Sequence, residues 1–338
     1  SGGTGAAVAA NLAGLGLGTD TGGSIRVPSS YNQLVGVRPT VGLASRDGIV
    51  PLALSQDTGG PMARSVLDAA VALDAVAGVD AADPVTSRQE GEVPASYTQY
   101  LDEGALDGTR IGYVPSMLGS NAATLRLWAQ TRATLESLGA TVVEVTPPTT
   151  WSPVLPNGFA SVLSEGSGST NEFKHDLDAY VATHLAPQVE ARTLQGIVDS
   201  GRYVPSRRST YVSRDAVTEE AYQAWAGPEG SHTKVLAEGK VLVTAMLDDA
   251  DLDALVYPSA NPYGTIGTNL RLSQNTGLPA VTVPVGQAVA TDGTVTGGGV
   301  NLELLGRDFD EGPLLGLAYA LEQATQARTS PALYGPLG

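Results

Sequence analysis

The spacing of apolar residues along the chain predicts helices that alternate with short strands. Between Arg64 and Ala77, apolar side chains recur at intervals of three and four residues, which is the period of an amphipathic helix. Helices are likewise predicted at 122–138, 234–247 and 311–326, and short apolar or β-branched runs predict strands at 109–114, 141–145, 252–257 and 281–285. Helices that alternate with strands indicate an α/β fold.

The remaining segments are less regular. Residues 3–15 are small and apolar, which predicts a closely packed helix. Residues 80–97 mix Asp, Pro, Ser and Glu without a period, so we expect an exposed excursion there. A loop is predicted at 147–158 and helical stretches with polar breaks at 161–225, where substrate pockets are often built. The Asp-Gly pair within 291–294 is typical of a turn between hairpin strands.

Charge and composition exclude several classes of function. The 338 residues carry 35 acidic and 19 basic side chains, a net charge of -16, so a nucleic acid would be repelled. The absence of cysteine excludes thiolate catalysis and cysteine-bound zinc. The three histidines, at 175, 184 and 232, lack the spacing of metal ligands, and no metal is expected. No apolar run reaches the roughly 20 residues of a membrane span, so we expect neither nucleic acid nor membrane as a partner.

The strongest chemical signal is the turn Gly22-Gly23-Ser24. Two glycines before a serine allow a sharp turn and leave peptide N–H groups uncovered. That geometry can hold an oxyanion beside a nucleophilic hydroxyl, although a serine in a glycine-rich turn is also common as a helix cap. Ser24 is therefore the candidate nucleophile.

Further motifs surround this turn and extend over almost the whole chain. Ser-Gly-Gly-x-Gly-Ala-Ala opens the sequence, Gly-Thr-Asp-Thr-Gly-Gly-Ser-Ile-Arg-Val-Pro follows at 18–28, and Gly-Val-Arg-Pro-Thr stands at 36–40. This series resembles the signature block of the amidase signature family of serine hydrolases, and later blocks at 45–51, 55–62, 277–284 and 304–307 continue the resemblance. The resemblance implies one large α/β domain with a mixed central sheet flanked by helices.

The same resemblance assigns catalytic roles within the turn. The family's nucleophilic serine corresponds to Ser24, which forms an acyl-enzyme with the substrate. The oxyanion hole corresponds to the peptide N–H groups of Thr21, Gly22 and Gly23, with Ser24 as a further donor. Because backbone donors fixed in a turn need no reorganisation as charge develops, this assignment agrees with the chemistry of the residues themselves.

Three other residues receive supporting roles from the resemblance. Asp20 corresponds to a buried aspartate that holds the loop through backbone hydrogen bonds. Arg26 is expected to fix the loop through charged hydrogen bonds. Ser1 matches the second serine of a pair and would assist the catalytic network by hydrogen bonding.

The family activates its nucleophile with a bridging serine and a neutral lysine, which correspond to positions before Ser1. Lys174, Lys234 and Lys240 lie in other contexts, and we predict them to be surface charges. We therefore expect residues 1–338 to be the C-terminal portion of a single amidase domain, inactive without the N-terminal segment that supplies both groups. The alternative is a catalytically inactive, amidase-like binding protein.

The substrate is suggested by two local similarities. Residues 55–62 and, more briefly, 172–177 resemble bacterial peptide amidases more than the tRNA-dependent amidotransferase component. We expect an amide hydrolase that releases ammonia or an amine, acts on C-terminal peptide amides and needs no cofactor. The alternative is a general aliphatic or aryl amide hydrolase. Both the bacterial cytoplasm and secretion remain open as the location.

Overall fold

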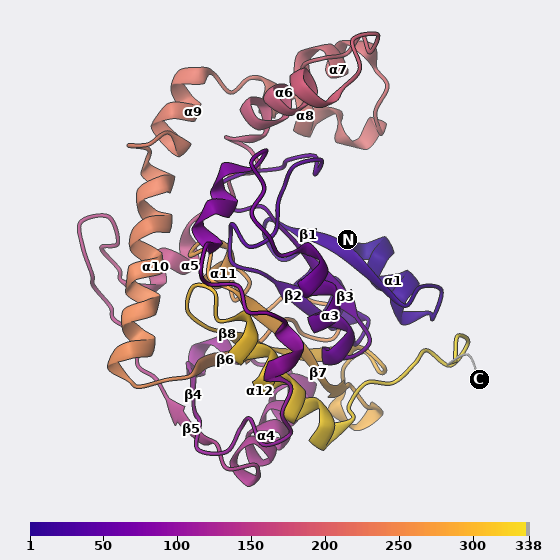
Figure 1. Cartoon of the computed structure of the whole chain (residues 1–338), viewed down its shortest axis with the longest axis vertical. Helices are drawn as coiled ribbons and strands as arrows, with labels where there is room; N and C mark the ends of the chain where they lie inside the picture. Colours follow the sequence, from indigo (N-terminus) through magenta and orange to yellow (C-terminus); the bar gives the residue numbers. More distant parts are fainter. Residues whose placement is uncertain (336–338) are drawn as a thin grey trace.

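Eight strands form one mixed sheet in the computed structural model, which describes residues 1–335 (Figure 1). The sheet order is β1-β3-β2-β7-β8-β6-β4-β5. Pairing is antiparallel from β1 through to β6 and parallel between β6, β4 and β5. This confirms the predicted mixed central sheet. The strands are β1 (Leu15–Asp20), β2 (Val35–Arg38), β3 (Thr58–Ala63), β4 (Arg110–Tyr113), β5 (Thr141–Glu144), β6 (Ala254–Pro258), β7 (Ala280–Gln287) and β8 (Gly299–Leu305).

The antiparallel hairpin of β7 and β8 occupies the middle of the sheet. All the residues of β8 are buried, so both faces of the strand are covered by other parts of the chain. Successive side chains of a strand point to opposite faces. Leu302 and Leu304 therefore enter the larger apolar core, whereas Glu303 between them points to the other face. This alternation directs a buried carboxylate toward the side of the sheet that carries the turn with Ser24.

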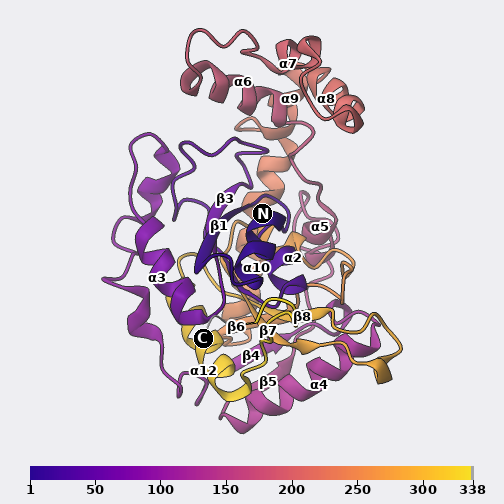
Figure 2. The same cartoon turned by 90° about the vertical axis from the view of Figure 1, so that its right-hand side faces the viewer.

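Helices cover both faces of the sheet (Figure 2). On one face, α3 (Val66–Val76), α4 (Ala122–Ser137) and α12 (Glu311–Thr325) enclose the larger apolar core. A second core lies beneath α5 (Phe159–Ser164) and α10 (Ser231–Asp249). The short helices on the side of the catalytic turn are α1 (Gly2–Ala9), α2 (Arg26–Tyr31) and α11 (Arg271–Gln274). Among the described residues, no helix is both long and apolar enough to cross a membrane.

A group of three helices, here called the helical cap, lies at one end of the molecule (Figure 1). It consists of α6 (Phe173–His184), α7 (Leu194–Ser200) and α8 (Arg208–Asp215), and α9 (Glu219–Ala226) connects it to α10. The cap has its own small apolar cluster, formed by Phe173, Leu177, Val181 and Leu194. It therefore packs around a separate centre from the two cores that enclose the sheet.

The predicted helix at 3–15 is wrong in its second half. The helix α1 ends at Ala9, and the chain then enters strand β1 at Leu15. Glycines in β1 allow α1 to lie close against the strand: a Cβ atom at Gly16 would come within 2.5 Å of the Thr4 Cγ2 atom. The small residues therefore serve helix-to-strand packing, and they are shared between the two elements.

Residues 80–97 are less exposed than predicted. They form the 3-10 helix Pro84–Gln89 and lead into a second, Tyr97–Tyr100. Thr86, Gln89 and Tyr97 are buried. The Gln89 side-chain amide donates to the carbonyl oxygens of Gly42, Leu43 and Gly78 at 2.8–2.9 Å. Polar side chains are buried here because they satisfy loop carbonyls, which a search for apolar periodicity does not detect.

Candidate active site

Ser24 lies in the turn between β1 and α2, and its side chain is exposed. Within residues 1–335, its hydroxyl makes no hydrogen bond. Gly23 is required by its backbone conformation, and Gly22 leaves little room for a side chain. A Cβ atom would come within 2.8 Å of the Gln274 side-chain oxygen at Gly22, and within 2.8 Å of the Leu270 Cδ1 atom at Gly23, whose φ is +117°. The turn thus presents a free hydroxyl on a backbone that only glycine can adopt without strain.

The carboxylate of Asp20 stabilises the turn through hydrogen bonds. This carboxylate is fully buried. One oxygen accepts from the Gly23 N–H at 2.7 Å, and the other accepts from the Ile25 N–H at 3.1 Å and from the Arg26 Nε at 3.1 Å. A single side chain therefore holds both the end of the turn and the start of helix α2. This geometry fits the supporting roles predicted for Asp20 and Arg26.

The buried charges extend beyond the two residues named from the sequence. Arg26 Nη1 lies 2.8 Å from Glu303 Oε1, which also accepts from the Tyr257 hydroxyl at 2.7 Å. Arg38 Nε lies 3.4 Å from Asp20 Oδ1. Sequence reasoning assigned no role to Arg38 or Glu303. Arg38 lies inside the motif at 36–40, and Glu303 is the single charge in the apolar run of β8. Both features could have marked these residues as buried charges.

These contacts keep Asp20 and Arg26 ionised. Burial alone raises the pKa of Asp20, but the charges of Arg26 and Arg38 and the hydrogen bonds outweigh it, and the pKa lies well below its usual range. Burial lowers the pKa of Arg26, but Asp20 and Glu303 more than compensate, and the pKa is raised. Paired charges of opposite sign therefore replace water around the base of the turn.

The predicted oxyanion donors differ in their present partners. The N–H of Gly23 is bonded to Asp20. In the part of the chain that the structure describes, the N–H groups of Thr21 and Gly22 have no acceptor. Two of the three predicted donors thus have no acceptor within residues 1–335, while the third supports the turn.

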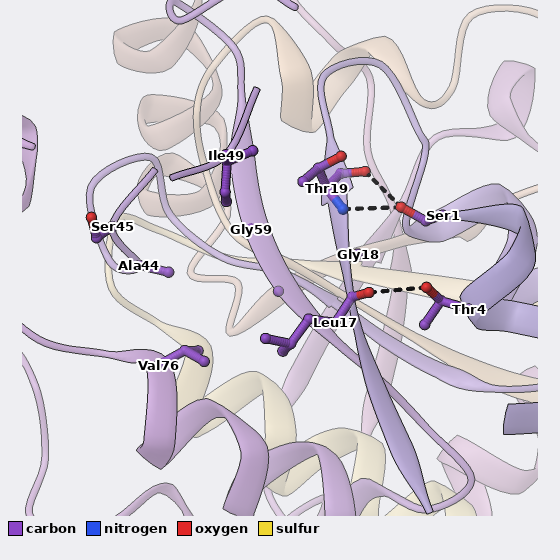
Figure 3. Close-up of a pocket in the computed structure, with 11 residues that line it drawn as sticks. Ser1, Thr4, Leu17, Gly18, Thr19, Ala44, Ser45, Ile49, Gly59 and Val76 are labelled. Carbon is purple, nitrogen blue, oxygen red and sulfur yellow. Dashed lines mark hydrogen bonds between the residues drawn. The ribbon is translucent and has the colours of Figure 1, made fainter. Parts of the chain in front are cut away.

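Ser1 lies beside β1, at some distance in the chain from the turn. Its Oγ atom accepts from the Thr19 N–H at 2.9 Å and donates to the Thr19 carbonyl at 3.1 Å. It borders a cavity of about 540 Å³, whose apolar lining includes Leu17, Ile49 and Val76 (Figure 3). Ser24 does not line this cavity. The structure therefore connects Ser1 to the strand that leads into the turn, and among the described residues Ser1 makes no hydrogen bond with Ser24.

The lysines of the chain are engaged away from Ser24. Their partners are Asp215 for Lys174, Glu229 for Lys234 and Asp308 for Lys240, at 3.1, 3.0 and 2.7 Å. Burial lowers the pKa of Lys240, although its hydrogen bond to Asp308 opposes the shift. Lys174 and Lys240 are half-buried, so only Lys234 is the fully exposed charge predicted from the sequence. No lysine here is placed to take a proton from Ser24.

Comparisons with known proteins show which family the chain resembles in sequence and fold. The amidase family profile matches residues 1–315. The structure of peptide amidase from Stenotrophomonas maltophilia superposes with a TM-score of 0.82 at 35% identity, covering 97% of this chain and 66% of that one. An amidase family protein from Bacillus anthracis superposes with a TM-score of 0.78 at 26% identity, covering 97% and 60%.

A sequence relative carries a different description. This relative, a glutamyl-tRNA(Gln) amidotransferase subunit from Ruegeria sp., is 32% identical over 98% of this chain and 68% of its own length. The chain thus spans about two thirds of the length of these relatives. The profile match, the shared fold and the signature turn around Ser24 agree, and the chain belongs to the amidase signature family.

Proposed function

We propose that this chain carries the nucleophile and oxyanion turn of an amide hydrolase that removes the terminal amide group of peptides. The observation that carries the proposal is the exposed Ser24 hydroxyl on a glycine turn that a buried Asp20 holds in place. The similarity to a peptide amidase supports the choice of substrate.

The proposed reaction is an acyl transfer in two halves. A base takes the hydroxyl proton of Ser24 as its Oγ atom bonds to the carbonyl carbon, and the carbonyl oxygen becomes an oxyanion. The free N–H groups of Thr21 and Gly22 donate to that oxygen. The C–N bond then breaks, the nitrogen gains a proton and leaves as ammonia, and an ester remains on Ser24. Water attacks the ester, which yields the carboxylic acid and restores the hydroxyl.

The base has to come from outside residues 1–338 in this proposal, because each lysine of the chain is paired elsewhere. We propose that these residues form the C-terminal portion of one amidase domain, completed by a segment with a lysine and a serine. Residues 1–338 alone are expected to release no ammonia, and the full-length enzyme is expected to release it. Rapid turnover by the shorter chain would contradict this assignment of the base.

The substrate is tested by comparing ammonia release from three classes of compound. An amidated peptide is expected to be the best substrate, ahead of acetamide and anilides. A fluorophosphonate probe is expected to label Ser24, with Ser24→Ala as the unlabelled control. Labelling without release from amidated peptides would favour a general amide hydrolase, and no labelling of the full-length enzyme would favour an inactive binding protein.

The similarity to an amidotransferase component supports a second candidate, an ammonia-releasing protein that works with other proteins. The charge of -16 opposes direct contact with tRNA. Ammonia release from glutamine that depends on added partner proteins would support this candidate. Release from amidated peptides by the enzyme alone would exclude it.

A further inference from the structure

A short loop beside the catalytic turn is held by an unusual series of carboxylates. The loop comprises residues 52–57, between the motif at 45–51 and strand β3. The N–H groups of Leu52 and Ala53 donate to Asp57 Oδ2 at 2.7 and 3.0 Å. Asp57 is buried, with 5% of its surface exposed. A side chain of the loop thus closes the loop on itself.

The next two N–H groups of the loop bond to the first turns of the helical cap. Leu54 donates to Asp176 Oδ2 at 2.8 Å. Ser55 donates from its backbone to Glu172 Oε2 at 3.1 Å and from its hydroxyl to Glu172 Oε1 at 2.7 Å. Four consecutive N–H groups therefore end on carboxylates, two within the loop and two at α6.

The remaining oxygen of Asp57 reaches the catalytic turn. Its Oδ1 atom accepts a hydrogen bond from the Thr21 hydroxyl, and both side chains are buried. Within residues 1–335, no other hydrogen bond holds Thr21 or Gly22. Asp20 fixes only the second half of the turn, from Gly23 onward. The first half, which contains the two free oxyanion donors, depends on the contact with Asp57.

We propose that Asp57 is a positioning residue that sets the oxyanion donors of Thr21 and Gly22 through the Thr21 hydroxyl, and that loop 52–57 ties this support to α6. The inference rests on the proposed function. Asp57 touches no reacting atom. Displacing the donors weakens hydrogen bonds that strengthen only as the oxyanion forms, so the loss falls on kcat rather than on KM.

The first test compares Thr21→Val with Thr21→Ser in the full-length enzyme. Valine keeps the shape of threonine but lacks the hydroxyl, whereas serine keeps the hydroxyl. Removing one oxyanion donor costs about 100- to 1000-fold in kcat, so displacing donors is expected to cost about 10- to 100-fold in T21V. T21S is expected to stay within about threefold of the wild type, with KM little changed in both.

A matched control separates positioning from stability. Thr131 is also buried, and its hydroxyl donates to the Leu127 carbonyl at 2.8 Å within α4, on the opposite face of the sheet. Thr131→Val is expected to shift the unfolding midpoint as T21V does, with kcat unchanged. Equal kcat values for T21V, T21S and the wild type would overturn the proposal.

A second test asks whether Asp57 acts through Thr21. Asp57→Ala removes the acceptor of the Thr21 hydroxyl and of the two loop N–H groups, whereas Asp57→Asn could keep both contacts because the Thr21 hydroxyl can also accept from an NH2 group. The double variant T21V/D57A is expected to lose no more kcat than D57A alone. If the loss of kcat in the double variant equals the product of the losses in the two single variants, Asp57 does not act through Thr21, and the proposal fails.

Hydrogen exchange keeps the inference testable without turnover. The amide of Gly23, which is bonded to Asp20 within the same turn, is expected to exchange faster in T21V and D57A than in the wild type and T131V. If the wild type hydrolyses no amide but exchange rises, the proposed function fails and the support by Asp57 stands. If amides are hydrolysed but exchange and kcat are unchanged in T21V, the inference fails and the function stands.

Discussion

Asp20 and Arg26 meet beneath the catalytic turn, with the Arg26 Nε atom 3.1 Å from Asp20 Oδ2 and both side chains fully buried. The two residues stand on either side of Gly22, Gly23 and Ser24. Their ion pair therefore joins the two ends of the turn, and Ser24, the proposed nucleophile, lies in the loop between them. Because the pair is shielded from water, Asp20 depends on Arg26 and Arg38, and Arg26 on Asp20 and Glu303, for compensation of their charges.

Asp20→Asn is expected to destabilise the fold strongly. The change leaves Arg26 and Arg38 without their shared anion, and removing one partner of a buried ion pair costs about 3–5 kcal/mol. Urea unfolding at pH 7 measures the loss. Glu136→Gln is the control, since its pairing with Arg132 on α4 is exposed and its loss should be far smaller. Equal losses in the two variants would contradict the role given to Asp20.

Ser24→Ala is expected to abolish turnover without affecting the fold. Loss of a catalytic serine typically reduces kcat by more than about 10,000-fold. The hydroxyl makes no hydrogen bond within residues 1–335, so the unfolding midpoint should not change. Ser87→Ala, which removes a hydroxyl bonded only to the Pro84 carbonyl, should keep full activity. Turnover by S24A at the wild-type rate would refute Ser24 as the nucleophile.

Gly23→Ala is expected to reduce kcat more than tenfold. Its φ of +117° disfavours any side chain, and the new Cβ atom would press on Leu270. Gly48→Ala is the matched control, because Gly48 also has a positive φ, of +78°, but no heavy atom lies within 4 Å of its Cβ position. Both variants carry backbone strain, and only G23A should lose activity. Similar kcat values would show that the turn tolerates a side chain.

Asp176 is expected to make stability fall as pH rises from about 4 to 6. Burial, helped by the nearby Glu172 and Asp57, raises the pKa of Asp176 to about 6 although its bond to Leu54 opposes the shift. In that window the unfolded chain has already lost the proton that the native protein retains. The native state thus binds more protons, and the cost reaches about 3 kcal/mol above pH 6.

Asp176→Asn tests this dependence, because the amide oxygen can still accept from Leu54 but cannot ionise. Urea midpoints between pH 4 and 8 should show a shallower decline for D176N than for the wild type. Glu322, whose pKa burial raises to about 7, adds its own decline to both proteins. Parallel curves for the two proteins would contradict the assignment.

Regular amphipathic elements could be predicted from the sequence, because their periodicity reflects which face is buried. The helices at 64–77, 122–138, 234–247 and 311–326 are present as α3, α4, α10 and α12. Strands β2 and β3 were missed because glycine and proline interrupt them. Gly60 in β3 shows the reason, because a Cβ atom there would lie 2.2 Å from the Val37 carbonyl oxygen. Close packing of the strands therefore selects glycine at this position, although glycine has a low β propensity.

The glycine turn and its nearby supports could be predicted from the sequence, but the distant residues that complete the support could not. Asp20 and Arg26 lie within four residues of Ser24, inside the same motif at 18–28, so the motif itself identifies them. Glu303 lies 277 positions beyond Arg26, and Asp57 lies 36 beyond Thr21. Only the fold brings such side chains together, and no local pattern marks their distance from the turn.

The central place of β7 and β8 has a consequence for synthesis of the protein. On the ribosome, β1 to β3 and β4 to β6 emerge first, yet they belong to opposite halves of the sheet. Each half has an unpaired strand edge until the β7–β8 hairpin inserts between them. The hairpin also brings Glu303 to Arg26. Release of an unfinished nascent chain would therefore leave two exposed strand edges, at β2 and β6, that could pair with other chains. The turn with Ser24 would also lack the contact between Arg26 and Glu303.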